Sequence, residues 1–91
     1  SNRTSEIFID SKGNVFAGLE KGVCIYNPEL DKFDLLTTEE NINPSLVNSI
    51  QEDANGTIWI GGFNGLWKFD DAKRKLIPTS FDKPIMSLTI I

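Results

Sequence analysis

Short runs of apolar residues follow one another along the whole chain, separated by polar turn residues. Each run is four to six residues long, and Gly, Asp, Asn or Pro residues lie in the segments between the runs. Runs of this length between turn residues predict β-strands. The inner runs at 15–17 and 58–60 are apolar without alternation, so we expect both faces of these strands to be covered. The expected strands are 6–10, 14–18, 22–27, 32–36, 47–52, 57–61, 65–70 and 75–78.

The pattern repeats itself at an offset of 43 residues, without a gap between 5 and 33. A period in the low forties, made of four short strands, is typical of a propeller blade. The sequence therefore predicts an all-β fold: a β-propeller fragment of two four-stranded antiparallel blades, with Phe16 and Trp59 at equivalent buried positions. The pairs of identical residues are Asp10/Asp53, Gly13/Gly56, Gly18/Gly61, Gly22/Gly65 and Lys32/Lys75.

The division of the chain follows from the same repeat. Residues 1–4 read as a tag remnant or disordered start, 5–46 as the first blade with its linker, and 47–84 as the second. Ile85-Met-Ser-Leu matches Val47-Asn-Ser-Ile at an offset of 38. We therefore expect 85–91 to be the first strand of a following blade.

The repeated Asp and Gly residues are expected to be structural. An Asp three residues before a Gly can accept N–H groups of a turn that the Gly closes with a positive φ. Asp53-Ala-Asn-Gly superficially resembles a calcium loop, but Lys12 stands in the equivalent turn where a ligand would be needed. The structural set is Asp10, Gly13, Gly18, Gly22, Asp53, Gly56, Trp59, Gly61 and Gly65.

Composition narrows the function classes. The 91 residues carry a net charge of −4 and no histidine, which argues against nucleic-acid binding because phosphates require clustered cations. No apolar stretch approaches the roughly 20 residues that span a bilayer, so we expect no membrane contact. The single cysteine, Cys24, aligns with Trp67 and is interpreted as a packing residue. We expect no catalytic residue, metal site or cofactor.

The second copy, from Asn48 to Asp70, resembles the two-component regulator propeller repeat. The resemblance lies in Ser-apolar-x-Glu-Asp, then Gly56-x-apolar-Trp-apolar-Gly61, then Asn-Gly-Leu and an aromatic followed by Asp. It implies a periplasmic sensor propeller of the Bacteroidetes type, in which such repeats sense oligosaccharides for a hybrid histidine kinase. The kinase lies outside this chain.

Loop residues are the candidates for ligand binding. In a propeller, the turns between the second and third strands of each blade open on the same face as the linkers between blades. An aromatic beside amides and carboxylates is typical of a sugar-binding surface. The candidates are Phe63, Asn64 and Phe81, with Glu20 and Lys21 on the same side. The alternative interpretation of the aromatics is packing against a neighbouring blade.

Two other functions stay open at this point. One is the propeller scaffold of a carbohydrate-active enzyme, a lyase or lactonase, which would need converging histidine, metal ligands or tyrosine. The other is a structural interaction propeller of the tryptophan-aspartate type, whose Gly-His and Trp-Asp dipeptides are missing here.

A closed propeller typically needs at least four blades, and two blades would expose apolar faces. We therefore expect self-association through exposed blade faces and the C-terminal strand, or packing against the remaining blades of a larger sensor.

Overall fold

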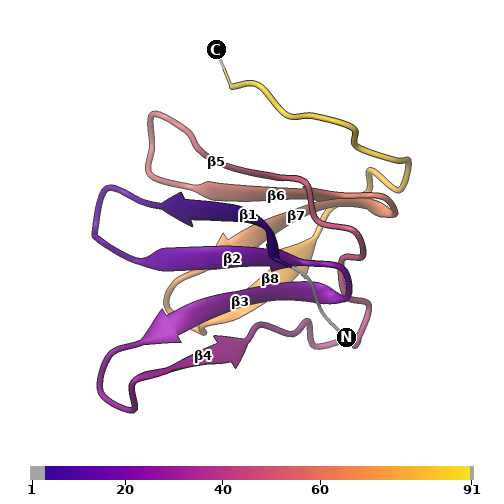
Figure 1. Ribbon diagram of the computed structural model, residues 1–91. Coiled ribbons are helices and arrows are strands. Elements are labelled where there is room, and N and C mark those ends of the chain that lie inside the picture. The colour runs from indigo at the N-terminus through magenta and orange to yellow at the C-terminus, as the bar shows by residue number, and fades with distance from the viewer. Residues whose placement is uncertain (1–3, 91) are drawn as a thin grey trace.

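The computed structural model describes residues 4–90 as two four-stranded antiparallel sheets (Figure 1). This confirms the predicted all-β class. Blade 1 consists of β1 (Thr4–Ile9), β2 (Val15–Leu19), β3 (Gly22–Asn27) and β4 (Lys32–Leu35). Blade 2 consists of β5 (Ser49–Glu52), β6 (Ile58–Gly62), β7 (Gly65–Asp70) and β8 (Lys75–Pro78). In both blades the strand order follows the chain order. Of the expected start at 1–4, residues 1–3 lie outside the described part, and Thr4 begins β1.

The turn between the first two strands of each blade is built around an aspartate. Oδ1 of Asp53 accepts the N–H groups of Asn55 and Thr57, both at 2.9 Å. Oδ1 of Asp10 accepts those of Lys12 and Asn14, at 3.0 and 2.7 Å. The glycines three residues after each aspartate have φ of 83° at Gly56 and 87° at Gly13, a conformation that favours glycine. These carboxylates hold their turns through direct hydrogen bonds.

The core lies between the two blades, which stack face to face (Figure 1). Because strand side chains alternate between faces, each blade has a forward face, toward the next blade along the chain, and a rear face. The forward face of blade 1 packs on the rear face of blade 2. Phe16 and Phe69 meet there edge to face, with ring centroids 5.2 Å apart. The buried side chains are Phe16, Val23 and Ile25 from blade 1 and Ile50, Ile58, Ile60, Trp67, Phe69 and Leu76 from blade 2.

Val47 joins the two blades immediately before β5. Its N–H donates to the carbonyl oxygen of Leu19 at 3.1 Å, across to blade 1. This explains why β5 begins at Ser49 and not at residue 47, as the sequence predicted: Val47 is bonded to the preceding blade. A Cβ on Gly18 would lie 2.7 Å from Cγ1 of Val47, so the missing side chain lets Val47 approach β2.

Ile85 repeats this arrangement on blade 2. Its N–H donates to the carbonyl oxygen of Gly62 at 2.9 Å, and Gly62 stands 43 residues after Leu19. A Cβ on Gly61 would lie 2.6 Å from Cγ2 of Ile85. Residues 85–90 form no strand, so the expected first strand of a third blade stays a prediction.

The burial expected for Trp59 is wrong, although its position in the blade is the one expected. Phe16 and Trp59 occupy equivalent register positions on forward faces. Phe16 is fully buried, whereas Trp59 is half-buried. The reason is that blade 2 covers the forward face of blade 1, while no blade among residues 4–90 covers the forward face of blade 2.

Candidate functional site

The loops of interest gather at one end of the strands. The β2–β3 turn, the linker at 43–46, the β6–β7 turn and the segment at 79–84 are tied together by backbone bonds. Leu46 donates to the carbonyl oxygen of Glu20 at 2.7 Å, and Phe63 to that of Ser45 at 2.8 Å. Leu66 donates to the carbonyl oxygen of Phe81 at 3.3 Å. We call this surface, residues 20–21, 43–46, 63–64 and 79–84, the linker face.

The side chain of Asn64 is hydrogen-bonded to the linker at residues 43–46. Its Oδ1 accepts the N–H of Ser45 at 2.9 Å, and its Nδ2 donates to the carbonyl oxygen of Asn43 at 3.1 Å. Since both ends of the amide bond the backbone within the chain, a ligand would have to compete with them. The sequence could not reveal this role, because it depends on the path of a linker about twenty residues away.

Phe63 and Phe81 present apolar surface to solvent on the linker face. Their side chains are 52 % and 42 % exposed. Phe63 lies in the β6–β7 turn, and Phe81 follows β8. The segment with Phe81 is fixed by Thr79, whose N–H and Oγ1 both donate to the carbonyl oxygen of Leu66, at 3.0 and 2.8 Å. Two exposed aromatics on anchored backbone form a surface that a ligand ring can pack against. Glu20 and Lys21, in the β2–β3 turn of the same linker face, are also exposed.

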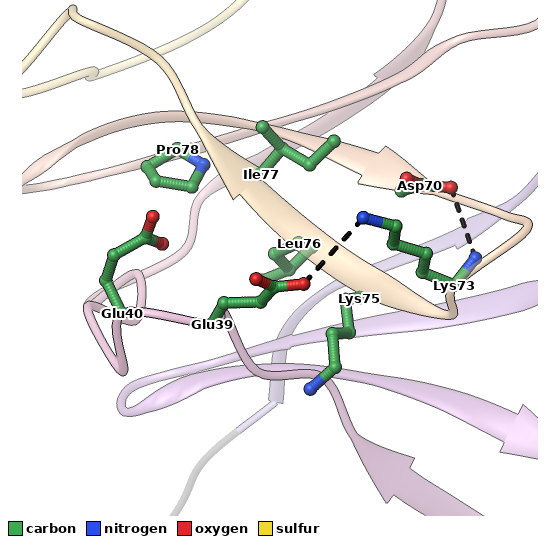
Figure 2. A pocket seen from close by; sticks show the side chains of 8 residues that line it. All are labelled: Glu39, Glu40, Asp70, Lys73, Lys75, Leu76, Ile77 and Pro78. Carbon is green, nitrogen blue, oxygen red and sulfur yellow. Dashed lines mark hydrogen bonds and ion pairs between the residues drawn. The ribbon is translucent and has the colours of Figure 1, made fainter.

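A cleft of about 210 Å³ lies away from the linker face, between β8 and the segment that joins β4 to β5, here called the first linker (Figure 2). Nζ of Lys73 lies 3.8 Å from Oε1 of Glu39, and the backbone N–H of Lys73 donates to Oδ1 of Asp70 at 3.2 Å. Figure 2 shows Lys73 between the two carboxylates, with Ile77 and Pro78 along the other side. Lys73 and Glu39 already pair with one another, and the volume is below the roughly 300 Å³ of typical ligand pockets. The cleft is therefore a poor ligand site.

A second cleft, of about 430 Å³, lies between β3, β4 and Arg74. Two of its polar side chains bond one another: Nδ2 of Asn27 donates to Oδ2 of Asp34 at 3.1 Å. Nη1 of Arg74 donates to Oδ1 of Asp71 at 2.9 Å. Its size would admit a ligand, but Asn27, Asp34 and Arg74 already have partners within the chain.

The remaining reactive candidates are held in structural roles. Burial raises the pKa of the Cys24 thiol, and Sγ lies 3.7 Å from the carbonyl oxygen of Ala17, so the reactive thiolate is disfavoured at neutral pH. The indole N–H of Trp59, followed by the N–H groups of the turn, lowers the pKa of the Asp53 carboxyl. Among residues 4–90, no group of three or more His, Cys, Asp or Glu side chains is arranged to hold a metal ion. No helix in that range could cross a membrane.

Comparison with known proteins places one segment in a family. No curated protein matched the chain. Residues 41–64 match the family model of the two component regulator propeller. This segment includes the end of the first linker, β5, the Asp53 turn, β6 and the β6–β7 turn. The family resemblance of the sequence is confirmed for this segment: residues 41–64 are similar to the two component regulator propeller repeat.

Proposed function

We propose that this chain is part of the ligand-sensing propeller of a two-component sensor that acts in the periplasm and responds to oligosaccharides. The observation that carries the proposal is the family match at residues 41–64. A propeller of this kind transmits the presence of a ligand to a histidine kinase. The chain itself contributes binding surface and blade structure and performs no chemistry.

The linker face is the proposed contact with the sugar. Phe63 and Phe81 are half-exposed on it, and the apolar faces of pyranose rings pack on aromatic side chains. Glu20 and Lys21 carry charged groups on the same linker face. The surface is open and shallow, so we expect weak binding to these two blades, with Kd near 1 mM, or about −4 kcal/mol.

A titration followed by amide resonances tests the proposal. The chain is titrated with maltohexaose, cellohexaose, xylohexaose and a heparin-derived hexasaccharide. We expect at least one of them to shift the amide resonances of residues 20–21, 63–66 and 79–82. Phe63→Ala and Phe81→Ala are each expected to weaken that binding several-fold, because each removes one stacking surface.

Leu30→Ala is the matched control. Leu30 is also a large exposed apolar residue, 64 % exposed, but it lies in the β3–β4 turn, away from the linker face. The control is expected to bind as the parent chain does. Absence of binding to all four sugars, or shifts confined to the cleft around Asn27 and Arg74, would overturn the proposed site.

A further inference from the structure

Each blade has one face covered by the other blade and one face open within residues 4–90. The open rear face of blade 1 carries four large exposed side chains. Their exposed fractions are 56 % for Ile7, 63 % for Ile9, 47 % for Phe33 and 56 % for Leu35. Gathered on one sheet face, exposed apolar side chains of this size mark an interaction surface.

The two open faces are the two halves of the interface that already exists inside the chain. On the covered rear face of blade 2, the neighbouring residues on β5, β6 and β7 are Ile50, Ile60 and Trp67. Their equivalents on the open rear face of blade 1, 43 residues earlier, are Ile7, Ala17 and Cys24, paired in the same way. The forward faces correspond likewise. Phe8, Phe16 and Ile25 of blade 1 are replaced in blade 2 by Gln51, Trp59 and Lys68.

The equivalent positions on the open and covered faces carry side chains of different size. Trp59 is larger than Phe16, which it replaces on the forward face. Ala17 and Cys24 are smaller than Ile60 and Trp67, which they match on the rear face. The apolar character of both open faces is thus kept at these positions, although the sizes of the side chains differ.

Ile85 lies on the forward face of blade 2, at the place where a docked blade would begin. It lies against Gly61 as Val47 lies against Gly18, and bonds Gly62 as Val47 bonds Leu19. Val47, immediately before β5, contacts blade 1. The same local contact therefore exists where another blade would begin.

We propose that a second copy of this chain docks head to tail, with the forward face of blade 2 on the rear face of blade 1 of the next copy. Applying the repeat to the Phe16–Phe69 contact places Trp59 against Tyr26 of the next copy. An interface between two different faces is heterologous and closes into a ring when its rotation permits. Closure would leave no blade face open.

The C-terminal segment competes with this arrangement. The offset of 38 residues places 85–90 where Val47–Glu52 lie in blade 2, and 4–9 of a docked copy occupy that same place. β1 is paired with β2 along its length, whereas residues 86–90 form no strand. Docking therefore displaces the C-terminal segment and not β1. The C-terminal strand, expected from the sequence to take part in association, lies outside the proposed interface.

Light scattering coupled to size exclusion tests the proposal on the whole chain at micromolar concentration. We expect a mass two to four times the 10.2 kDa of one chain. Ile7→Glu on the rear face and Ile77→Glu on the forward face each place a charge in the interface, and both residues are exposed in the single chain. Each variant is therefore expected to be folded and monomeric.

A mixture of the two variants distinguishes a heterologous interface, made of two different faces, from a symmetric one, made of the same face twice. Each variant retains one intact face, so the mixture is expected to form a dimer, although neither does alone. Lys68→Ile, which restores the residue type of Ile25, is expected to tighten association at least tenfold. Leu30→Glu, a charge on an exposed apolar residue outside both faces, is the control and should leave the mass unchanged.

Several results would overturn the proposal. They are a parent chain of 10.2 kDa across the concentration range, a mixture of the two variants that stays monomeric, or full association of either variant alone. Deletion of residues 85–91 provides a further test. Retained or tighter association supports docking through the faces, whereas loss of association would assign it to the C-terminal strand.

Discussion

The indole nitrogen of Trp59 donates a 2.9 Å hydrogen bond to Oδ2 of Asp53, six residues earlier. In blade 1 the matching aromatic, Phe16, has no donor, and Nδ2 of Asn14 bonds Oδ2 of Asp10 at 2.9 Å instead. Asn14 stands where blade 2 has Thr57. The two blades thus satisfy the same carboxylate oxygen from different positions, which explains how the turn persists while the aromatic changes.

The Trp59–Asp53 bond predicts a pH-dependent stability. The bond lowers the pKa of Asp53 in the folded chain, so the unfolded chain binds the proton more readily. The bond therefore adds to the free energy of unfolding at pH values above the pKa of Asp in the unfolded chain, about 3.9. This stabilisation is lost as the pH falls through the pKa of Asp53 in the folded chain. We expect Trp59→Phe to be destabilised relative to the parent at pH 6, and the difference to narrow by pH 3. Urea unfolding at both pH values measures this.

Trp67→Phe is the control for that experiment. The indole N–H of Trp67 donates to the backbone carbonyl oxygen of Ile42 at 3.1 Å, an acceptor that does not titrate. Its loss of stability should be the same at pH 6 and pH 3. A Trp59→Phe difference that is equally independent of pH would show that the Asp53 bond does not contribute as described.

The two equivalent aromatics are expected to differ in their contribution to stability. Phe16 is fully buried between the blades, so Phe16→Ala should cost about 3–5 kcal/mol. Trp59 is half-buried on an open face, and Trp59→Ala should cost roughly half as much at concentrations where the chain is monomeric. Chemical denaturation of both variants gives the comparison. Equal costs in dilute solution would contradict the assignment of covered and open faces.

Close packing against Gly18 predicts a position-specific effect. A Cβ there would lie 2.7 Å from Cγ1 of buried Val47, so Gly18→Ala must displace Val47, at about 1–3 kcal/mol. At Gly61 the obstructing side chain is Ile85, which lies near the end of the chain and can move. Gly61→Ala should therefore cost less than Gly18→Ala. The reverse order in urea unfolding would exclude Val47 as the tight contact between blades.

The amide of Asn64 is expected to control the order of the linker. Asn64→Ala removes the acceptor for Ser45 N–H and the donor to Asn43, at about 1–2 kcal/mol. Hydrogen exchange of the Ser45 amide should become at least several-fold faster. Ser80→Ala, an exposed hydroxyl on the same linker face, is the control. Unchanged exchange at Ser45 in Asn64→Ala would count against this role.

The strands and the stacking of blades were predictable from the sequence because they follow from local patterns. Apolar runs of fixed length and an ungapped offset between Asp10 and Asp53 require no knowledge of distant contacts. The burial of Trp59 was not predictable, because it depends on whether a further blade covers this side chain and not on the strand that carries it. The ion pair of Glu39 and Lys73 was missed for a similar reason. Opposite charges 34 positions apart meet only through the path of the linker.

The central claim is that the 43-residue repeat folds as two blades stacked forward face on rear face. The most direct measurement is the pattern of nuclear Overhauser effects between aromatic rings. Strong effects are expected between Phe16 and Phe69, whose centroids lie 5.2 Å apart at an interplanar angle of 80°. Effects are also expected between Tyr26 and Phe33, 5.4 Å apart within blade 1. Effects within blade 1 without any between Phe16 and Phe69 would show that the blades form but do not stack, and would contradict the account.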